Sequence, residues 1–124
     1  MRRAAIIFEG GDPPHSDLHE TLIGLRHAIT LDTVEKYIQA GVGDVVLATN
    51  FPALATAAER LGARVWNTSH QQPFHFGKTL QQVVRAIGSE QVIYCSGAAL
   101  PLISQAEIQW ILAAMDRHAP CVVV

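Results

Sequence analysis

The sequence predicts an α/β fold, a three-layer α/β/α arrangement around a mostly parallel, Rossmann-like sheet. Short apolar runs alternate along the chain with segments of about a dozen residues whose apolar side chains recur at helical spacing. The short runs are continuously apolar, as expected for strands buried on both faces of a parallel sheet. Several helical segments stop at a glycine. This alternation is typical of successive βαβ units with right-handed crossovers.

The first strand is predicted at residues 4–8 and should be the central strand of the sheet. Its apolar run stops abruptly, and Gly10, Gly11 and Asp12 follow. Glycines after a buried strand let the backbone turn sharply and approach a ligand, and ligands of open α/β sheets bind at the carboxyl ends of strands. The loop at Gly10 and Gly11 is therefore the first candidate site. A glycine turn without a ligand is the alternative that this motif leaves open.

A long loop is predicted next, at residues 12–27. It contains His15 and His19 at a four-residue spacing, with Asp17 and Glu20 nearby, and these are residue types that bind metals. Zinc sites of this spacing normally lie on a helix or include further ligands, whereas this segment begins with two prolines. A solvated loop is therefore preferred, and no metal ligand is assigned in it.

The rest of the chain is predicted to continue the alternation of helices and strands. Glycines that follow an apolar stripe, as at Gly62 and Gly88, mark helix ends, and Ser104 with Glu107 forms a capping box. The same patterns predict that Ile7, Val46, Ile93 and Ile111 are nearly fully buried. Helices are expected at residues 29–40, 52–61, 76–87 and 104 to about 118, and strands at residues 44–49, 63–66 and 91–96.

The last four residues, 121–124, are predicted to start a fifth strand. No turn signal follows this strand. A chain that stops inside a buried strand suggests a larger domain that has been cut, or a sheet edge that a partner covers. We therefore expect residues 1–124 to form a single domain that is incomplete at its carboxyl end and that can associate as a homo-oligomer.

Composition and charge argue against several classes of protein. The chain has 124 residues, 49% of them hydrophobic, which suits one globular domain with a sizeable core. A net charge of −2 and the lack of any Lys or Arg run argue against a nucleic-acid binder. No apolar stretch reaches the roughly 20 residues of a membrane helix, so we expect no membrane association and a cytoplasmic location. Cys95 and Cys121 lie in apolar runs, which suits buried reduced thiols better than a disulfide.

Three stretches of the chain share a pattern with one protein family. AAIIFEGG, residues 4–11, is a strand that ends in glycines, and ITLDTVEKYIQAGVGDVVLATN, residues 29–50, is a helix, an Ala-Gly break and a strand ending in Thr-Asn. VIYCSGAALPLIS, residues 92–104, is a strand followed by a Pro-Leu loop. The pattern resembles the amino-terminal half of nucleotidyltransferase (NTP-transferase) domains with a glycosyltransferase-A-like fold, such as the molybdenum-cofactor guanylyltransferases and the sugar-phosphate nucleotidyltransferases.

The resemblance covers nearly the whole chain and implies a nucleotide site. In such proteins the glycine loop holds the base and phosphates of the nucleotide, and an aspartate before x-Pro binds the magnesium that bridges the phosphates. It implies an NTP or nucleotide-sugar as ligand, magnesium as cofactor and, if the domain is active, transfer of a nucleotidyl group to a small phosphorylated acceptor. The candidate nucleotide-binding residues are Gly10, Gly11, Asp12, Asn50, Lys78, Ser96, Gly97 and Ala98.

Lys78 enters this set for a physical reason, because a lysine at a helix amino terminus makes a fair anion site. An ordinary solvated first-turn residue is the alternative. The missing G-x-G-x-x-G after the first strand argues against a dinucleotide-binding domain.

The chain also departs from the family's pattern at two places. Asp12 and two prolines follow the glycines where the family has an Arg and a Lys, so that Arg26 is the first basic residue. Ala99 stands where the magnesium aspartate would precede x-Pro, and alanine offers no oxygen ligand. Glu9 and Asp12 are the residues left to replace it, and no catalytic residue is assigned. Because charge neutralisation is the main catalytic task, the alternative is a non-catalytic nucleotide-binding or assembly domain without the metal site.

Overall fold

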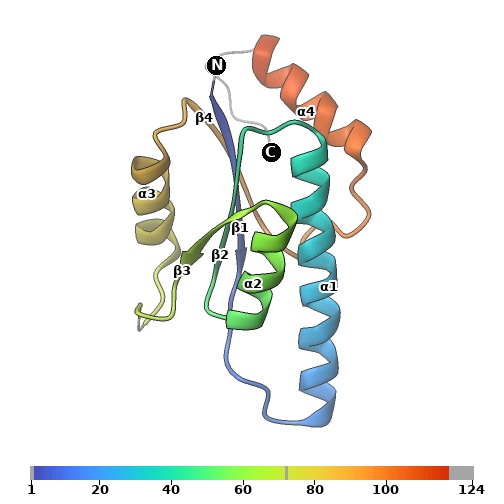
Figure 1. The fold of residues 1–124 in the computed structure, drawn as a ribbon, viewed down its shortest axis with the longest axis vertical. Helices are drawn as coiled ribbons and strands as arrows, with labels where there is room; N and C mark the ends of the chain where they lie inside the picture. Colours follow the sequence, from blue (N-terminus) through green and yellow to red (C-terminus); the bar gives the residue numbers. More distant parts are fainter. Residues whose placement is uncertain (1, 72, 118–124) are drawn as a thin grey trace.

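The computed structural model describes residues 2–71 and 73–117, in which strands and helices alternate along the chain (Figure 1). The predicted α/β class is confirmed. The fifth strand expected at residues 121–124, and Cys121 with it, lie outside the described residues. The elements are β1 (Arg3–Glu9), α1 (Asp17–Gln39), β2 (Asp44–Thr49), α2 (Pro52–Leu61), β3 (Arg64–Asn67), α3 (Phe76–Ile87), β4 (Gln91–Ser96) and α4 (Gln105–Arg117).

The four strands of the described sheet are all parallel, in the order β3-β2-β1-β4. β1 is hydrogen-bonded on both sides, so that Ile6 lies opposite Val46 of β2 and Tyr94 of β4. This confirms that the first strand is central. Because the strands are parallel, the glycine loop after β1, Asn50 after β2 and Ser96 at the end of β4 all meet at one edge of the sheet.

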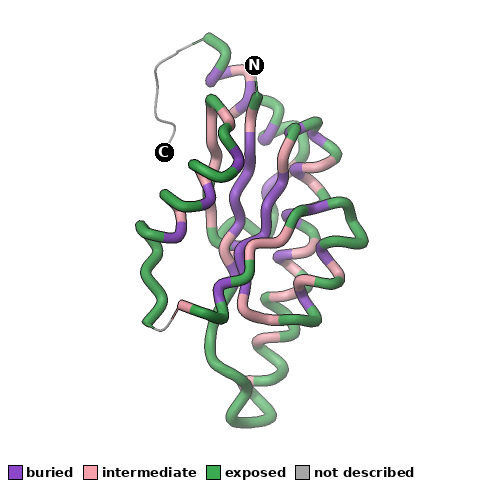
Figure 2. The backbone as a smooth tube through the Cα atoms, turned by 60° about the vertical axis from the view of Figure 1, so that its left-hand side comes forward, coloured by how far each residue is buried: buried purple, intermediate pink, exposed green. Residues whose placement is uncertain are grey.

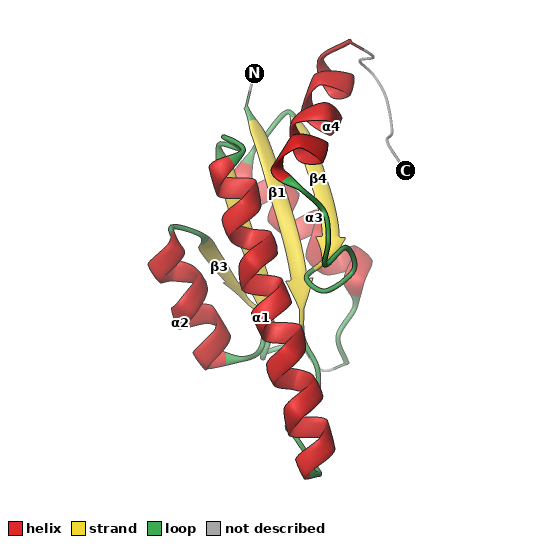
Figure 3. Cartoon of the chain, turned by 90° about the vertical axis from the view of Figure 1, so that its right-hand side faces the viewer, coloured by secondary structure: helices red, strands yellow, loops and turns green. Residues whose placement is uncertain are grey.

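Helices cover both faces of the sheet, and the core is concentrated along β1 and β2 (Figure 2). Successive side chains of β1 point to opposite faces. Ile7 packs in a core with residues of α1, α2 and α4, whereas Ile6 packs against α3. Figure 3 shows α1, α2 and α4 on the near side of the sheet and α3 behind it.

Local capping signals set several helix ends where the sequence predicted them. Gly62 and Gly88 end α2 and α3 in the left-handed region, with φ of 105° and 67°. At the start of α4, Ser104 Oγ accepts from the backbone N–H of Glu107 at 3.1 Å, and the Glu107 carboxylate accepts from the backbone N–H of Ser104 at 3.3 Å. The predicted capping box is therefore present.

The predicted loop at residues 12–27 is wrong, because α1 begins at Asp17. Ser16 is its N-cap, and its hydroxyl accepts from the backbone N–H of His19 at 3.0 Å. Asp17 and Glu20 add negative charge to the first turn, where the helix dipole favours it.

The core pattern did not reveal this early start, because the amino-terminal part of α1 extends beyond the sheet (Figures 1 and 3). Leu18, Leu22 and Leu25 of this part are exposed. The apolar residues in this part of α1 therefore do not form a stripe that faces the core.

Two of the four burial predictions are also wrong. Ile7 and Val46 are buried as expected, whereas Ile93 and Ile111 are only half-buried. β4 pairs with β1 alone in the described sheet, so Ile93 is covered from one side only. Ile111 lies beside the buried stripe of α4 and not within it.

Cys95 of β4 is a free, half-buried thiol, and the reduced state of the two cysteines stays a prediction because Cys121 lies outside the described residues. Its environment is apolar, and burial raises the pKa of the thiol to about 11. Burial likewise raises the pKa of the neighbouring Tyr37 phenol to about 12, helped by Cys95. Both groups are therefore protonated and unreactive at neutral pH. Among the described helices, none combines the length and apolar character needed to cross a membrane.

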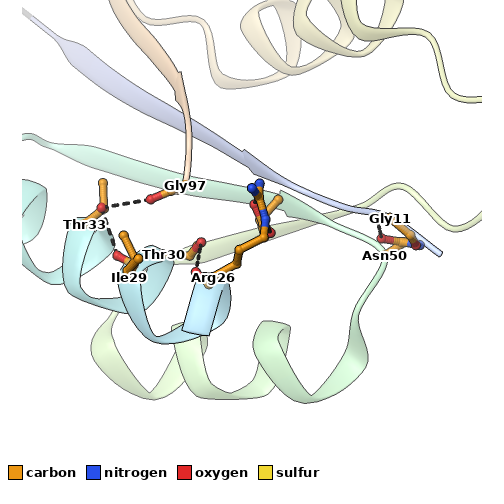
Figure 4. A network of polar contacts seen from close by, with 8 residues as sticks. Gly11, Arg26, Ile29, Thr30, Thr33, Asn50 and Gly97 are labelled. Atoms are coloured by element: carbon orange, nitrogen blue, oxygen red, sulfur yellow. Dashed lines mark hydrogen bonds and ion pairs between the residues drawn. The ribbon is translucent and has the colours of Figure 1, made fainter. Parts of the chain in front are cut away.

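Gly97 holds the end of β4 against α1 (Figure 4). Its carbonyl accepts a hydrogen bond from Thr33 Oγ1 at 3.0 Å, and its N–H donates to the carbonyl of Phe8 at 2.9 Å. A Cβ placed on Gly97 would lie 2.8 Å from Cβ of Thr30 and closer still to its Oγ1 and Cγ2. Only glycine fits this contact without displacing the helix.

We expect Ile7→Ala to lower the free energy of unfolding by about 2–5 kcal/mol, because it leaves a cavity in the main core. Ile93→Ala should cost roughly half as much, since that side chain is only half-buried. Urea unfolding of both variants measures the difference. Equal losses would show that β4 is as well covered as β1.

We expect Gly97→Ala to destabilise the domain by about 1–3 kcal/mol through the overlap with Thr30. The matched control is Gly24→Ala in α1, where an added Cβ meets no atom within 4 Å. That substitution should stabilise the helix by about 0.5–1 kcal/mol. Adding Thr30→Ala to the Gly97 variant should recover part of the loss, and strictly additive effects would argue against the overlap.

Candidate functional site

A cavity of about 510 Å³ opens at the carboxyl edge of the sheet. Its size falls within the usual range of small-molecule sites, and its position is where ligands of open α/β sheets bind. Elements distant in the sequence supply its walls. From the first half of the chain, the lining residues are Phe8 and Glu9 of β1, Gly10, Gly11 and Asp12 of the glycine loop, Arg26 of α1, Ala48 of β2 and Asn50, which follows β2. From the second half they are Thr68, Gln71, Pro73 and Phe74 of the segment before α3, Phe76 of α3 and Ser96 of β4.

Asn50 clamps the glycine loop on one side of the cavity (Figure 4). Its Oδ1 accepts from the N–H of Gly11 at 3.1 Å, and its Nδ2 donates to the Gly11 carbonyl at 2.7 Å. A Cβ on Gly10 would lie 3.0 Å from Asn50 Oδ1, whereas a Cβ on Gly11 would make an ordinary 3.8 Å contact with Phe51. Gly10 is therefore the glycine that the clamp requires, although the sequence pattern drew equal attention to Gly11.

An ion pair between a buried carboxylate, Glu9, and a half-exposed arginine, Arg26, lies in the lining of the cavity. Glu9 is 3% exposed, and its two carboxylate oxygens accept from Nε and Nη2 of Arg26 at 2.9 and 2.8 Å. The hydrogen bond to Glu9, together with its charge, raises the pKa of Arg26. Both Glu9 oxygens are engaged, so this carboxylate is not free to bind a metal. Sequence reasoning missed the role of Arg26 because it placed that residue in a loop.

Three phenylalanines form the opposite side of the cavity, called here the aromatic wall: Phe8, Phe74 and Phe76. The ring centroids of Phe8 lie 4.7 Å from Phe76 and 6.5 Å from Phe74. Phe74 is 50% exposed and Phe76 is 43% exposed, so both present ring surface that the domain itself leaves uncovered. The only sequence signal was the Pro-Phe-His-Phe run before α3, and its spacing does not distinguish ligand contacts from packing.

The structure brings together five of the eight predicted nucleotide-binding residues. Gly10, Gly11, Asp12, Asn50 and Ser96 line the one cavity. The other three lie outside its lining: Lys78 is exposed in the first turn of α3, Gly97 packs on α1, and Ala98 is half-buried beyond it. Nucleotide binding by any of the eight stays a prediction.

His27 lies below the glycine loop, beside the ion pair. Its ring packs on Phe51, with centroids 4.6 Å apart. Burial lowers the pKa of His27, while the nearby Glu9 carboxylate opposes that shift in part. A neutral imidazole is therefore favoured here, and it serves as an aromatic support for the residue that follows Asn50.

The described residues do not supply the ligands of a magnesium ion. Ala99 is exposed in the turn after β4, where its N–H donates to the carbonyl of Ser96. Within residues 2–71 and 73–117, no three His, Cys, Asp or Glu side chains are grouped to hold a metal. His15 and His19 contact one another, and His19 Nδ1 accepts from the backbone N–H of His15 at 3.2 Å. These residues do not fit the metal that the family resemblance implied.

Comparisons with known proteins find similarity in structure only. No family model and no curated protein matches the sequence. The fold is similar to that of a CMP:2-keto-3-deoxy-manno-octonic acid synthetase complexed with CTP, with a TM-score of 0.72 and 18% identity over 97% of this chain. It is also similar to a nucleotidyl transferase from Methanothermobacter thermautotroptrophicus, with a TM-score of 0.61 and 18% identity over 90% of this chain.

This chain covers 49% and 57% of those two proteins, respectively, so it spans about half their length. Because the identities are low, the likeness establishes the fold. The chain therefore has an NTP-transferase-like α/β fold, as the three sequence stretches indicated.

Proposed function

We propose that this chain is a nucleotide-binding domain that binds its ligand without magnesium and does not itself transfer a nucleotidyl group. The observation that carries the proposal is the cavity at the carboxyl edge of the sheet. It combines a glycine loop clamped by Asn50 with an aromatic wall, and Asp12 is the only carboxylate among its described lining residues that is not paired with Arg26.

Binding is supported by the location and chemistry of this cavity. Ligand sites are largely apolar, with a few polar groups that fix orientation, and this cavity has both kinds of lining. All nucleobases can stack on aromatic side chains, because every base has a π face. One protein of the same fold is complexed with CTP, and nucleotide binding is the corresponding proposal for this chain.

The loss of transfer is supported by the missing metal ligands. Magnesium requires near-octahedral oxygen coordination, usually from one or two carboxylates together with substrate phosphates. Ala99 offers none, and Glu9 is bonded to Arg26 through both oxygens. Transfer to a small phosphorylated acceptor, which the family resemblance implied, would leave the charge of the reacting phosphates without compensation.

We expect calorimetric titration with the four NTPs to give weak binding, with Kd of roughly 0.1–1 mM, that is the same with and without magnesium. Gly10→Val should abolish this binding, because its branched side chain meets Asn50 and disrupts the clamp. Asn50→Ala should weaken it as well. The matched control is Gln109→Ala, which removes a hydrogen bond from α4 to the Ala40 carbonyl, outside the cavity lining, and should leave affinity unchanged.

Pyrophosphate release measured with NTP, magnesium and a sugar phosphate should not exceed background. An affinity that rises about tenfold with magnesium, or steady release of pyrophosphate, would contradict the proposed loss of metal chemistry. A complete lack of binding by the unaltered chain would contradict the proposal as a whole.

A further inference from the structure

The internal bonding of the cavity points to its ligand class. We infer that the site recognises the base and sugar of a nucleoside and gains nothing from a polyphosphate, so that nucleosides bind at least as tightly as their triphosphates. This inference rests on the proposed nucleotide binding. It further specifies that the preferred ligand is uncharged. It sets this chain apart from a domain built to hold an NTP.

Intramolecular bonds compete with a phosphate for the groups that could hold it. Among the described residues, Arg26 is the only cation that lines the cavity, and two of its five N–H donors bond to Glu9. The N–H of Gly11, which a phosphate-binding loop would direct at its ligand, donates to Asn50. At the amino terminus of α3, the N–H of Lys78 donates to His75 Nδ1 at 3.2 Å. A phosphate that bound the N–H of Gly11 or Lys78 would have to break one of these bonds, and at Arg26 it would meet a charge that Glu9 already compensates.

The charge of the cavity lining also disfavours a polyanion. Two carboxylates, Glu9 and Asp12, and one guanidinium, Arg26, line it. With Glu9 and Arg26 neutralising one another, the negative charge of Asp12 is left. A triphosphate would therefore approach like charge, and at low salt this repulsion is little screened.

What the cavity does offer suits a nucleoside. The exposed faces of Phe74 and Phe76 can stack on a planar ring. The Asp12 carboxylate accepts hydrogen bonds, and the Ser96 hydroxyl both donates and accepts them. Sugar hydroxyls and exocyclic amino groups are donors that match these positions. Recognition then depends on stacking and neutral donors.

The test is a titration of the unaltered chain with adenosine, guanosine, cytidine and uridine and with the four corresponding 5′-triphosphates, without magnesium, followed by calorimetry or NMR. At about 20 mM salt, we expect each triphosphate to bind roughly three- to tenfold more weakly than its nucleoside. The difference should narrow at about 300 mM salt, because salt screens the repulsion from Asp12.

Two charge variants test the cause. Because Asp12 is exposed, Asp12→Asn should leave the fold intact. It should also remove most of the difference in affinity between triphosphates and nucleosides. Glu9→Gln keeps the shape of the buried side chain but frees the charge of Arg26, and it should strengthen triphosphate binding roughly tenfold relative to nucleoside. Thermal unfolding of both variants separates an altered site from an altered fold.

A third variant tests the aromatic wall. Phe74→Ala should weaken nucleoside binding roughly five- to a hundredfold, and Phe74→Tyr should retain it. Trp110→Ala removes another exposed aromatic side chain, on α4 and outside the cavity, and should have no effect. Equal losses in the Phe74→Ala and Trp110→Ala variants would contradict stacking at the wall.

The outcomes separate this inference from the proposed function. Triphosphates that bind about tenfold more tightly than nucleosides would overturn the inference and leave nucleotide binding in place. Failure of every nucleoside and every triphosphate to bind would overturn both. Nucleosides that bind at least as tightly as triphosphates, with the preference reversed in Glu9→Gln, would support both.

Discussion

The ion pair between Glu9 and Arg26 is the interaction on which the site depends. β1 is central and buried on both faces, and it ends in a carboxylate that is 3% exposed. A buried carboxylate without a partner is strongly destabilising, so this position needs a cation that can donate a hydrogen bond to each carboxylate oxygen. Arg26 meets this need from α1, which ties the helix to the end of the central strand in the lining of the cavity.

The same pair bears on which ligands the proposed site can hold. The buried Glu9 carboxylate already accepts two hydrogen bonds from Arg26, so a metal would have to displace the arginine, and Glu9 compensates the charge that Arg26 would offer a phosphate. Ala99 lies in the turn after β4, and within the described part of the chain no three His, Cys, Asp or Glu side chains are grouped to hold a metal. A shared fold can host different chemistry, because function resides in the side chains placed on it.

Close contacts hold the polar side of the cavity in place. Gly97 fits against Thr30 and Thr33 of α1, and Asn50 holds the glycine loop at both the N–H and the carbonyl of Gly11. The segment with Phe74 and Phe76 instead leaves aromatic surface exposed, which is costly unless a ligand or partner covers it. The cavity thus pairs a fixed polar side with an uncovered apolar side.

The sequence alone determined the α/β class, the central position of β1 and most helix ends, because apolar runs, glycine stops and the Ser104–Glu107 capping box are local signals. It also identified five lining residues, since the carboxyl ends of parallel strands must meet. Only the tertiary structure decided the early start of α1, the half-burial of Ile93 and the aromatic wall. Above all, it decided the pairing of Glu9 with Arg26. These depend on contacts between residues far apart in the chain, and neither periodicity nor capping reports such contacts.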